Sequence, residues 1–212
     1  MTEAPSFIEL ALASRVLQFG EFTLKSGRIS PYFFNAGLFQ DGASLSSLGG
    51  FYARRMLSSG LDFDVLFGPP YKGIPLVSTM SVALARDHGV SMPYAYARKE
   101  VKDHGEGGQL VGAPLKGRVL IVDDVVTAGT AANEAIQMIL AAGAEPAGVL
   151  VAIDRQERGA DGSMSAVQSL EATHGIPVLS IVTFSEIVDY VRRSQSEAEI
   201  ERMLAYRDAY GI

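Results

Sequence analysis

Short apolar runs alternate along this chain with longer stretches whose apolar residues recur at helical spacing. The apolar runs are Phe63–Phe67, Pro93–Ala97, Val119–Val122, Ala147–Ile153 and Val178–Val182. The helical stretches are Leu45–Ser58, Ile74–Asp87, Ala131–Ala142, Val167–Thr173, Glu186–Arg193 and Glu197–Tyr206. Strands that alternate with helices of about ten residues or more form βαβ units and a mainly parallel sheet. We therefore predict an α/β fold with a central parallel sheet flanked by helices.

The first 40 residues depart from this alternation. Apolar residues from Phe7 to Leu17 recur at helical spacing, with Ser6 as a candidate N-cap. The segment Glu21–Ala36 has separated aromatics, a Ser-Gly pair and Ser30-Pro31, a pattern typical of short strands and turns. We predict a small N-terminal appendage on one domain that spans residues 1–212, a length that suits a single large core.

Composition excludes several classes of protein. The chain has no cysteine, so a disulfide framework, a Cys-based zinc site and a cysteine nucleophile are excluded. Its three histidines, His88, His104 and His174, form no HExxH pattern, and we predict no protein-built metal site. The longest stretch without a charged residue, Ala172–Ser185, is too short for a membrane helix. The acidic N-terminus and a net charge of -6 favour a soluble, cytoplasmic protein that binds neither membranes nor nucleic acid through its overall charge.

The segment Arg98–Arg118 interrupts the alternation with many glycines and charged residues. Loops of this length inside compact domains are usually functional or disordered. We therefore expect a loop with a role in the site.

The segment from Val119 to Asn133 carries the most chemistry. Its strand ends at two carboxylates, Asp123 and Asp124, and a loop of small residues then leads into a helix. Ligands of α/β proteins bind at the carboxyl ends of parallel strands. Backbone N–H groups at the start of the helix can bind an anion, and the hydroxyls of Thr127 and Thr130 can add to them. This arrangement suits a sugar phosphate.

Other interpretations of this motif are weaker. The loop lacks the GxxxxGK[ST] pattern of an ATP-binding loop, and no GxGxxG follows a strand. An ordinary strand–turn–helix, in which the acids only cap and solvate the turn, remains open on the residues alone.

The run VLIVDDVVTAGTA resembles the signature of type I phosphoribosyltransferases, which bind phosphoribosyl pyrophosphate (PRPP). FTLKSGRISPYFFNAGLF, LFGPPYKGIPL, RKEVKDHGEGG and VAIDRQERG are similar to segments of one branch, the orotate phosphoribosyltransferases of the bacterial, enteric-like type. The resemblance spans nearly the whole chain. It implies transfer of the ribose 5-phosphate group of PRPP to orotate, giving orotidine 5'-phosphate and pyrophosphate in de novo pyrimidine synthesis.

The resemblance also implies a set of PRPP-binding residues. In such enzymes the two aspartates bind the ribose hydroxyls, and the following loop wraps the 5'-phosphate. The cations of the glycine-rich loop, 98–118, bind pyrophosphate, and Lys102 is the expected group for transition-state stabilisation, so Lys102, Asp123 and Asp124 are the predicted catalytic residues. The complete predicted set is Lys25, Tyr71, Lys72, Arg98, Lys99, Lys102, His104, Asp123, Asp124, Val125, Val126, Thr127, Ala128, Gly129, Thr130 and Ala131.

For orotate, the resemblance implies contacts from an N-terminal hood within residues 1–40 and from an arginine beyond the sheet. The predicted residues are Lys25, Phe33, Phe34, Thr127 and Arg155. An arginine can pair with a carboxylate through two parallel hydrogen bonds. Core packing is an alternative for at least one of the two phenylalanines.

The family further implies Mg²⁺ bound mainly through PRPP and pyrophosphate, and a homodimer in which the mobile loop 98–118 closes over the neighbouring subunit's site. Where the familiar pyrophosphate loop has alanine, this chain has Pro70, which has no backbone N–H to donate. His88 and His174 lie outside the motifs and are predicted to be structural.

Three alternative functions remain possible. A transferase for purines would lack a use for Arg155. A PRPP-sensing regulator would not need the cationic loop residues Lys99 and Lys102. A receiver-like signalling domain would leave the TAGTA loop unexplained.

Overall fold

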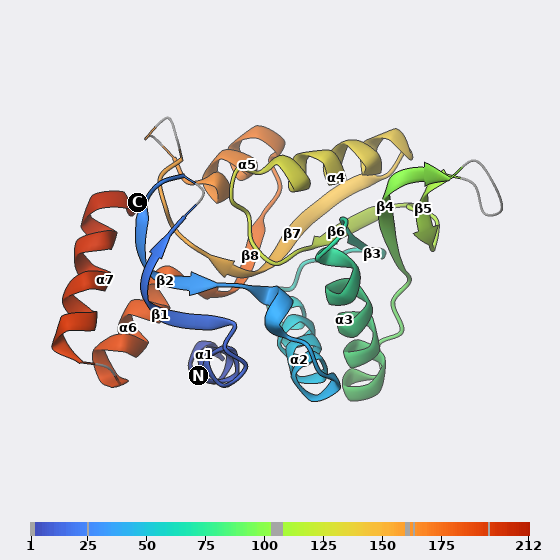
Figure 1. Cartoon of the computed structure of the whole chain (residues 1–212). Coiled ribbons are helices and arrows are strands. Elements are labelled where there is room, and N and C mark those ends of the chain that lie inside the picture. The colour runs from blue at the N-terminus through green and yellow to red at the C-terminus, as the bar shows by residue number, and fades with distance from the viewer. Residues whose placement is uncertain (1–2, 25, 103–107, 160–161, 163, 195) are drawn as a thin grey trace.

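In the computed structural model, the predicted alternation forms a central sheet with helices on both faces (Figure 1). The structure describes residues 3–24, 26–102, 108–159, 162, 164–194 and 196–212. Within them, six strands form the sheet in the order β5–β4–β3–β6–β7–β8. The strands are β3 (Val65–Gly68), β4 (Tyr94–Lys102), β5 (Gly108–Gly112), β6 (Arg118–Val122), β7 (Glu145–Asp154) and β8 (Val178–Thr183).

All neighbouring pairs in the sheet are parallel except β4 and β5, which are antiparallel. Strands β3 and β6 are continuous apolar runs because both of their faces are covered. Leu66, Leu120 and Leu150 face one hydrophobic core, and Phe67, Ile121 and Val151 face the other.

Each face of the sheet has its own pair of helices (Figure 1). Helices α2 (Gly42–Ser59) and α3 (Gly73–His88) cover one face, and α4 (Thr130–Ala141) and α5 (Ala166–His174) cover the other. The helix ends follow the sequence signals: Asp41 caps α2 by accepting two backbone N–H groups, and Gly60, Gly89 and Gly175 end helices with positive φ.

The N-terminal segments form a separate hood beside the sheet. Helix α1 (Ala4–Ala13) leads into a two-stranded antiparallel ribbon, β1 (Leu17–Thr23) and β2 (Ile29–Phe34). Helices α6 (Phe184–Ser194) and α7 (Glu197–Tyr210) pack beside it (Figure 1). Tyr32 stacks on Phe184 at a centroid distance of 5.2 Å and meets Tyr206 edge-on at 6.3 Å. The sequence predicted a hood formed by residues 1–40 alone, whereas in the structure the C-terminal helices also pack against it.

Two local predictions were wrong. Helix α1 begins before Ser6, with Glu3 at the N-cap position and Pro5 in the first turn, where a missing N–H costs nothing. It also ends before Val16 and Leu17: Arg15 has a φ of 55°, which no helix continues, and Leu17 begins β1.

The expectation of a loop over residues 98–118 was also wrong in part. Strand β4 continues to Lys102, and Gly108–Gly112 pairs with it as an antiparallel edge strand. We call these two paired strands, residues 94–102 and 108–112, the arm. It lies at the opposite side of the molecule from the hood (Figure 1). None of the helices in the described part of the chain is long and apolar enough to cross a membrane.

Candidate active site

The two carboxylates lie at the carboxyl end of β6, as predicted. The backbone N–H of Asp123 donates to the Leu150 carbonyl at 3.0 Å, and the Ala152 N–H donates to the Asp124 carbonyl at 2.9 Å. These bonds join the turn to β7. Asp123 Oδ1 accepts from the Asp124 N–H, and Asp124 Oδ1 accepts from the Val125 N–H, each at 2.9 Å. The pair is therefore fixed by backbone on both sides.

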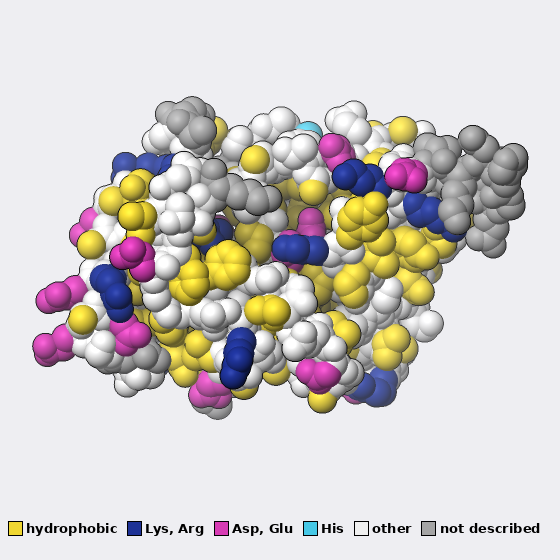
Figure 2. Space-filling view, viewed as in Figure 1, with side chains coloured by type: hydrophobic (Ala, Val, Ile, Leu, Met, Phe, Trp, Pro, Cys, Tyr) yellow, Lys and Arg dark blue, Asp and Glu magenta, His cyan; other side chains and the backbone are white. Residues whose placement is uncertain are grey.

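Lys72 comes to the same place from the end of β3. Its Nζ lies 2.6 Å from Asp124 Oδ2. Asp124 is only 7% exposed, whereas the Lys72 side chain is 54% exposed, so the cation reaches the carboxylate from the solvent side. Figure 2 shows acidic and basic side chains together in the hollow between the hood and the sheet. The parallel pairing of β3 with β6 brings these residues together.

Asp123 has an unusual protonation equilibrium. Burial, together with the neighbouring Asp124 charge, raises its pKa to about 7. One of two adjacent carboxylates therefore holds a proton for part of the time near neutral pH. A ligand that brings hydroxyl donors or a cation to this pair would change that balance.

A buried tyrosine forms a hydrogen bond with the backbone of the turn that carries the two carboxylates. The Tyr52 hydroxyl, on α2, donates to the backbone carbonyl of Asp123 at 2.8 Å, and the residue has no exposed surface. Burial, and then the negative charges of Asp124 and Asp123, raises the pKa of Tyr52 well above its usual value. The hydroxyl therefore stays protonated and remains a donor.

The turn that carries Lys72 depends on a close approach of two backbones. A Cβ at Gly73 would lie 2.5 Å from Pro69 Cδ and 2.8 Å from the Val122 carbonyl oxygen, so no larger residue fits. The Pro70–Tyr71 peptide bond is cis, and Tyr71 is 65% exposed. The Tyr71 residue and the Lys72 side chain are both exposed, and their contact with pyrophosphate stays a prediction.

The loop after the carboxylates has the geometry of an anion site. Gly129, at a φ of 74°, precedes α4, and no side chain caps the first turn of that helix. Thr127, Ala128 and Thr130 are exposed there. A helix start without a side-chain cap leaves backbone N–H groups for an anion, which the macrodipole also favours.

Asn133 links this loop to α5. Its Nδ2 donates to the Gly129 carbonyl at 3.0 Å, and its Oδ1 lies 2.6 Å from His174 Nε2. His174 therefore has a structural contact of the kind the sequence predicted for it.

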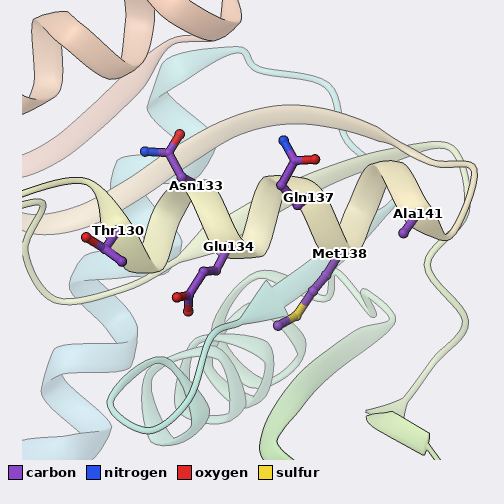
Figure 3. Close-up of a pocket in the computed structure, with 6 residues that line it drawn as sticks. All are labelled: Thr130, Asn133, Glu134, Gln137, Met138 and Ala141. Carbon is purple, nitrogen blue, oxygen red and sulfur yellow. The ribbon is translucent and has the colours of Figure 1, made fainter.

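A shallow, mostly apolar groove follows the outer face of α4 (Figure 3). Thr130 at the start of the helix and Met138 further along both line it. Its lining includes neither Asp123 nor Asp124. The groove is therefore separate from the carboxylate pair.

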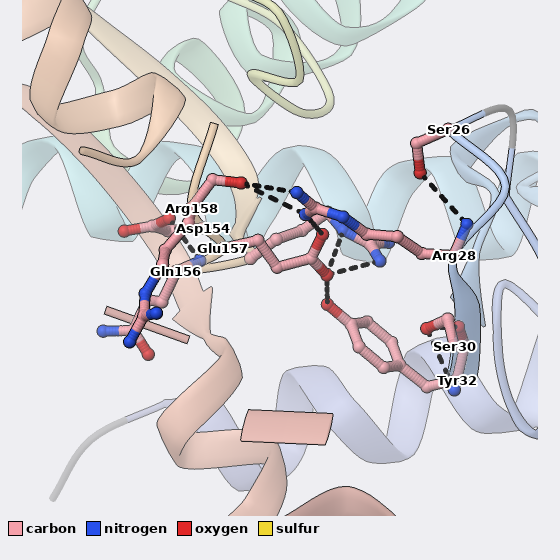
Figure 4. A network of polar contacts seen from close by, with 9 residues as sticks. Ser26, Arg28, Ser30, Tyr32, Asp154, Gln156, Glu157 and Arg158 are labelled. Atoms are coloured by element: carbon pink, nitrogen blue, oxygen red, sulfur yellow. Dashed lines mark hydrogen bonds and ion pairs between the residues drawn. The ribbon is translucent and has the colours of Figure 1, made fainter. Parts of the chain in front are cut away.

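A second polar cluster joins the hood to the end of β7 (Figure 4). Arg155 donates through Nε and Nη2 to Glu157 Oε1, at 2.9 and 2.6 Å. The Arg155 guanidinium also lies over the Tyr32 ring, 4.6 Å from its centroid. Arg28 of the hood donates to the Arg158 carbonyl at 3.1 Å from each of two nitrogens. The predicted carboxylate-binding arginine is thus already partly paired.

The two predicted phenylalanines of β2 point in opposite directions, as alternation along a strand requires. Phe34 is buried in the core, and Phe33 is half-buried and stacks on Phe22 at 5.5 Å. Core packing therefore accounts for Phe34, and Phe33 is the ring of the pair with a surface left to contact a ligand.

The remaining predicted residues are only partly described. Lys25 and His104 lie outside the described residues, and for Lys102 the structure describes the backbone alone. Arg98 is half-buried and Lys99 is exposed, both on β4 in the arm.

Residues 40–182 match the family model described as the phosphoribosyl transferase domain. Orotate phosphoribosyltransferase from Saccharophagus degradans is 55% identical, over 97% of this chain and 96% of that protein. The one from Pseudomonas paraeruginosa is 58% identical, over 97% of both chains. The crystal structure of orotate phosphoribosyltransferase from Francisella tularensis superposes with a TM-score of 0.90, at 47% identity, over 98% of this chain and all (100%) of that one.

The chain belongs to the orotate phosphoribosyltransferase family. The predicted type I phosphoribosyltransferase fold is confirmed, and so is the predicted enzyme activity, orotate phosphoribosyltransfer in pyrimidine synthesis. The purine, regulatory and receiver-like alternatives are set aside by the same similarity.

Two residues of this orotate phosphoribosyltransferase fold escaped the sequence analysis. Tyr52 lies in the middle of a helix, where only tertiary contact reveals its role. Glu157 follows Arg155 by two residues, but Gln156 between them has a φ of 50°, so the segment is not an extended strand and the spacing alone gave no signal.

Proposed function

We propose that this enzyme binds PRPP with its ribose at Asp123 and Asp124 and transfers the ribose 5-phosphate group to orotate at the Arg155 cluster. One observation carries the proposal. The half-buried Asp123 and the buried Asp124, whose Oδ2 lies 2.6 Å from Lys72 Nζ, come shortly before a helix start that no side chain caps. Such a site offers acceptors for ribose hydroxyls and donors for a phosphate within one turn of chain.

In this arrangement the segment Val125–Ala131 wraps the 5'-phosphate of PRPP. The exposed Thr127 and Thr130 hydroxyls supplement the backbone donors there. Tyr71 and Lys72 receive the pyrophosphate, on the side of the carboxylates toward β3. Pro70 has no N–H to donate, so the backbone after it provides the contact.

The reaction breaks the bond between ribose carbon 1 and the pyrophosphate oxygen, forms a bond from carbon 1 to the orotate ring nitrogen, and releases the acidic proton of that nitrogen. Positive charge develops at carbon 1 as pyrophosphate leaves with the bonding electrons. Nearby carboxylates favour that charge electrostatically, or hold the sugar in a reactive position. Asp123 and Asp124 serve in these roles, and Lys102 stabilises the leaving group.

Mg²⁺ fits the donor set as a substrate-held ion. Among the described residues no cluster of three or more His, Asp or Glu side chains could hold a metal. Magnesium commonly uses one or two carboxylates together with substrate phosphates. The ion, held mainly by the pyrophosphate group next to Asp123 and Asp124, would neutralise part of the leaving group's charge.

At the base end, Arg155 recognises the carboxylate of orotate, with Phe33, Lys25 and Thr127 around the planar ring. Arg155 has five N–H donors, and Glu157 engages those on Nε and Nη2. The remaining Nη1 side is the one offered to the substrate.

The active unit is a homodimer in which the arm of one subunit serves the site of the other. Arg98 and Lys99 lie on the arm, which extends at the side of the molecule away from the hood (Figure 1). Closure of the loop 98–118, which includes part of the arm, over the partner's site would exclude water and bring Lys102 and His104 to the pyrophosphate. A cytoplasmic location likewise remains a prediction.

An assay of orotate consumption with PRPP and Mg²⁺ tests the proposal. The parent protein should consume orotate, and Arg155→Ala should raise the KM for orotate while leaving that for PRPP within about twofold. For the shared site, inactive Lys102→Ala and Asp124→Asn subunits are mixed. Recovered activity supports sharing, and no recovery after verified subunit exchange contradicts it.

A further inference from the structure

The carboxylate of Glu157 is the centre of the cluster at the base end (Figure 4). Its Oε1 accepts both hydrogen bonds from Arg155 and a third, at 3.3 Å, from the Tyr32 hydroxyl. Its Oε2 lies 3.8 Å from Arg28 Nη1. Two segments that are distant in the chain, the hood at β2 and the segment after β7, thus meet at one side chain.

This carboxylate is well placed to fix an arginine. The Arg155 side chain is 14% exposed and that of Glu157 is 13% exposed, so their charge-assisted bonds are shielded from water. Tyr32 covers one face of the guanidinium, and Glu157 holds its Nε–Nη2 edge. A long arginine side chain otherwise loses several rotatable bonds of freedom when it binds a ligand.

The net charge of the cluster also favours binding of an anionic ligand. Arg28 and Arg155 carry two positive charges, and Glu157 carries one negative charge. These three side chains together keep one net positive charge, on a guanidinium whose Nη1 side is turned away from Glu157. A carboxylate ligand would complete the pairing.

We infer that Glu157 is a positioning residue for orotate: it holds Arg155 so that the Nη1 side faces the substrate carboxylate. The inference rests on the proposed role of Arg155. Glu157 does not touch the reacting atoms; it acts through Arg155 and sets the selectivity of the base end for an anionic base over a neutral one.

The test compares KM values for orotate and PRPP in Glu157→Ala, Glu157→Gln and Arg155→Ala. We expect Glu157→Ala to raise the KM for orotate about 10-fold, with the KM for PRPP within about twofold. Glu157→Gln should give a smaller rise, because the amide oxygen still accepts from Arg155. It also provides the measurement if the alanine variant does not fold.

Gln156→Ala is the matched control. Gln156 lies in the same segment, and its side chain accepts from the Ser185 N–H and hydroxyl rather than contacting Arg155. It should lower the melting temperature without raising the KM for orotate.

The outcomes distinguish failure of the inference about Glu157 from failure of the proposed role of Arg155. If Arg155→Ala raises the KM for orotate and neither Glu157 variant does, the inference is overturned and the role of Arg155 stands. If Arg155→Ala leaves that KM unchanged, the proposed role of Arg155 fails, and the inference fails with it. A KM for orotate that falls in Glu157→Gln would mark Glu157 as a competitor of the substrate and would also overturn the inference.

Discussion

The ribose-phosphate end of the site comes mostly from one continuous stretch, Asp123 to Thr130, whereas the base end joins the hood, the end of β7 and the C-terminal helix. The first is organised by local hydrogen bonds, such as the one that the Asp124 N–H donates to Asp123 Oδ1. The second depends on contacts between distant residues, such as Arg28 with the Arg158 carbonyl. Substitutions elsewhere in the chain should therefore disturb the ribose-phosphate end less than the base end, whose geometry depends on several separate segments.

The largest expected effect tests whether the ribose-phosphate end also depends on a contact outside the stretch Asp123 to Thr130. Gly73→Ala would place a Cβ 2.8 Å from the Val122 carbonyl, next to the carboxylates. Because backbone lies on both sides, we expect a loss of about 3 kcal/mol or more in unfolding free energy, measured by urea denaturation.

Gly42→Ala is the control for this change, since a Cβ there meets no atom within 4 Å and the residue begins a helix. It should be neutral or slightly stabilising. Equal stability of the two variants would show that the turn at Lys72 can shift to accept a Cβ, and would contradict the need for glycine at position 73.

Asp124→Asn should reduce kcat/KM by about 100-fold with little change in fold, because the amide keeps the size of the side chain and loses its charge. Steady-state kinetics with varied PRPP gives the measurement. A fall confined to kcat would indicate charge stabilisation, and a rise confined to KM would indicate positioning. A change below about threefold would contradict a role for Asp124 in either.

The raised pKa of Asp123 gives a pH-dependent effect on stability. An acid whose pKa is near 7 when folded, and near 4 when unfolded, costs stability as the pH rises between those values. Asp123→Asn should therefore be more stable than the parent by a few kcal/mol at pH 8, with the difference vanishing near pH 4. Urea denaturation across this range is the measurement, and a difference independent of pH would disprove the assignment.

The smallest effect concerns the hood. Arg28→Ala removes two bonds to the Arg158 carbonyl and the contact with the Tyr210 ring, 4.8 Å away. We expect a loss of about 1 kcal/mol in stability and a rise of a few-fold in the KM for orotate.

Combining Arg28→Ala with Asp124→Asn sharpens the comparison of the two ends. If they are independent, their effects on kcat/KM should add within about 0.5 kcal/mol. A larger coupling would show that the hood and the carboxylate turn act as one unit.

The same contrast explains what the sequence could reveal. The strand, the paired acids and the small-residue loop of the ribose-phosphate end are adjacent in the chain, so their order alone predicted where Asp123 and Asp124 lie. The strands and helices of the sheet were also predictable, because burial on both faces leaves continuous apolar runs such as Val119–Val122.

Contacts between distant segments were not predictable in this way. The apolar spacing of Val16 and Leu17 continues that of α1, and only the reversal at Arg15 places them outside the helix. The charged segment after Ala97 has the composition of a loop, yet its backbone pairs across a hairpin. The contacts of Tyr32 with Glu157 and with the Arg155 guanidinium join segments far apart in the chain, and no local pattern predicts them.

The strand order of the sheet has a consequence for synthesis on the ribosome. Strand β3 sits between β4 and β6, but β6 emerges only after α3 and the whole arm have been made. Until then, the edge of Val65–Gly68 that will face β6 stays unpaired, a short and fully apolar edge of the kind that seeks other chains. Conditions that slow translation between Gly73 and Arg118 should therefore favour aggregation of the nascent chain over folding.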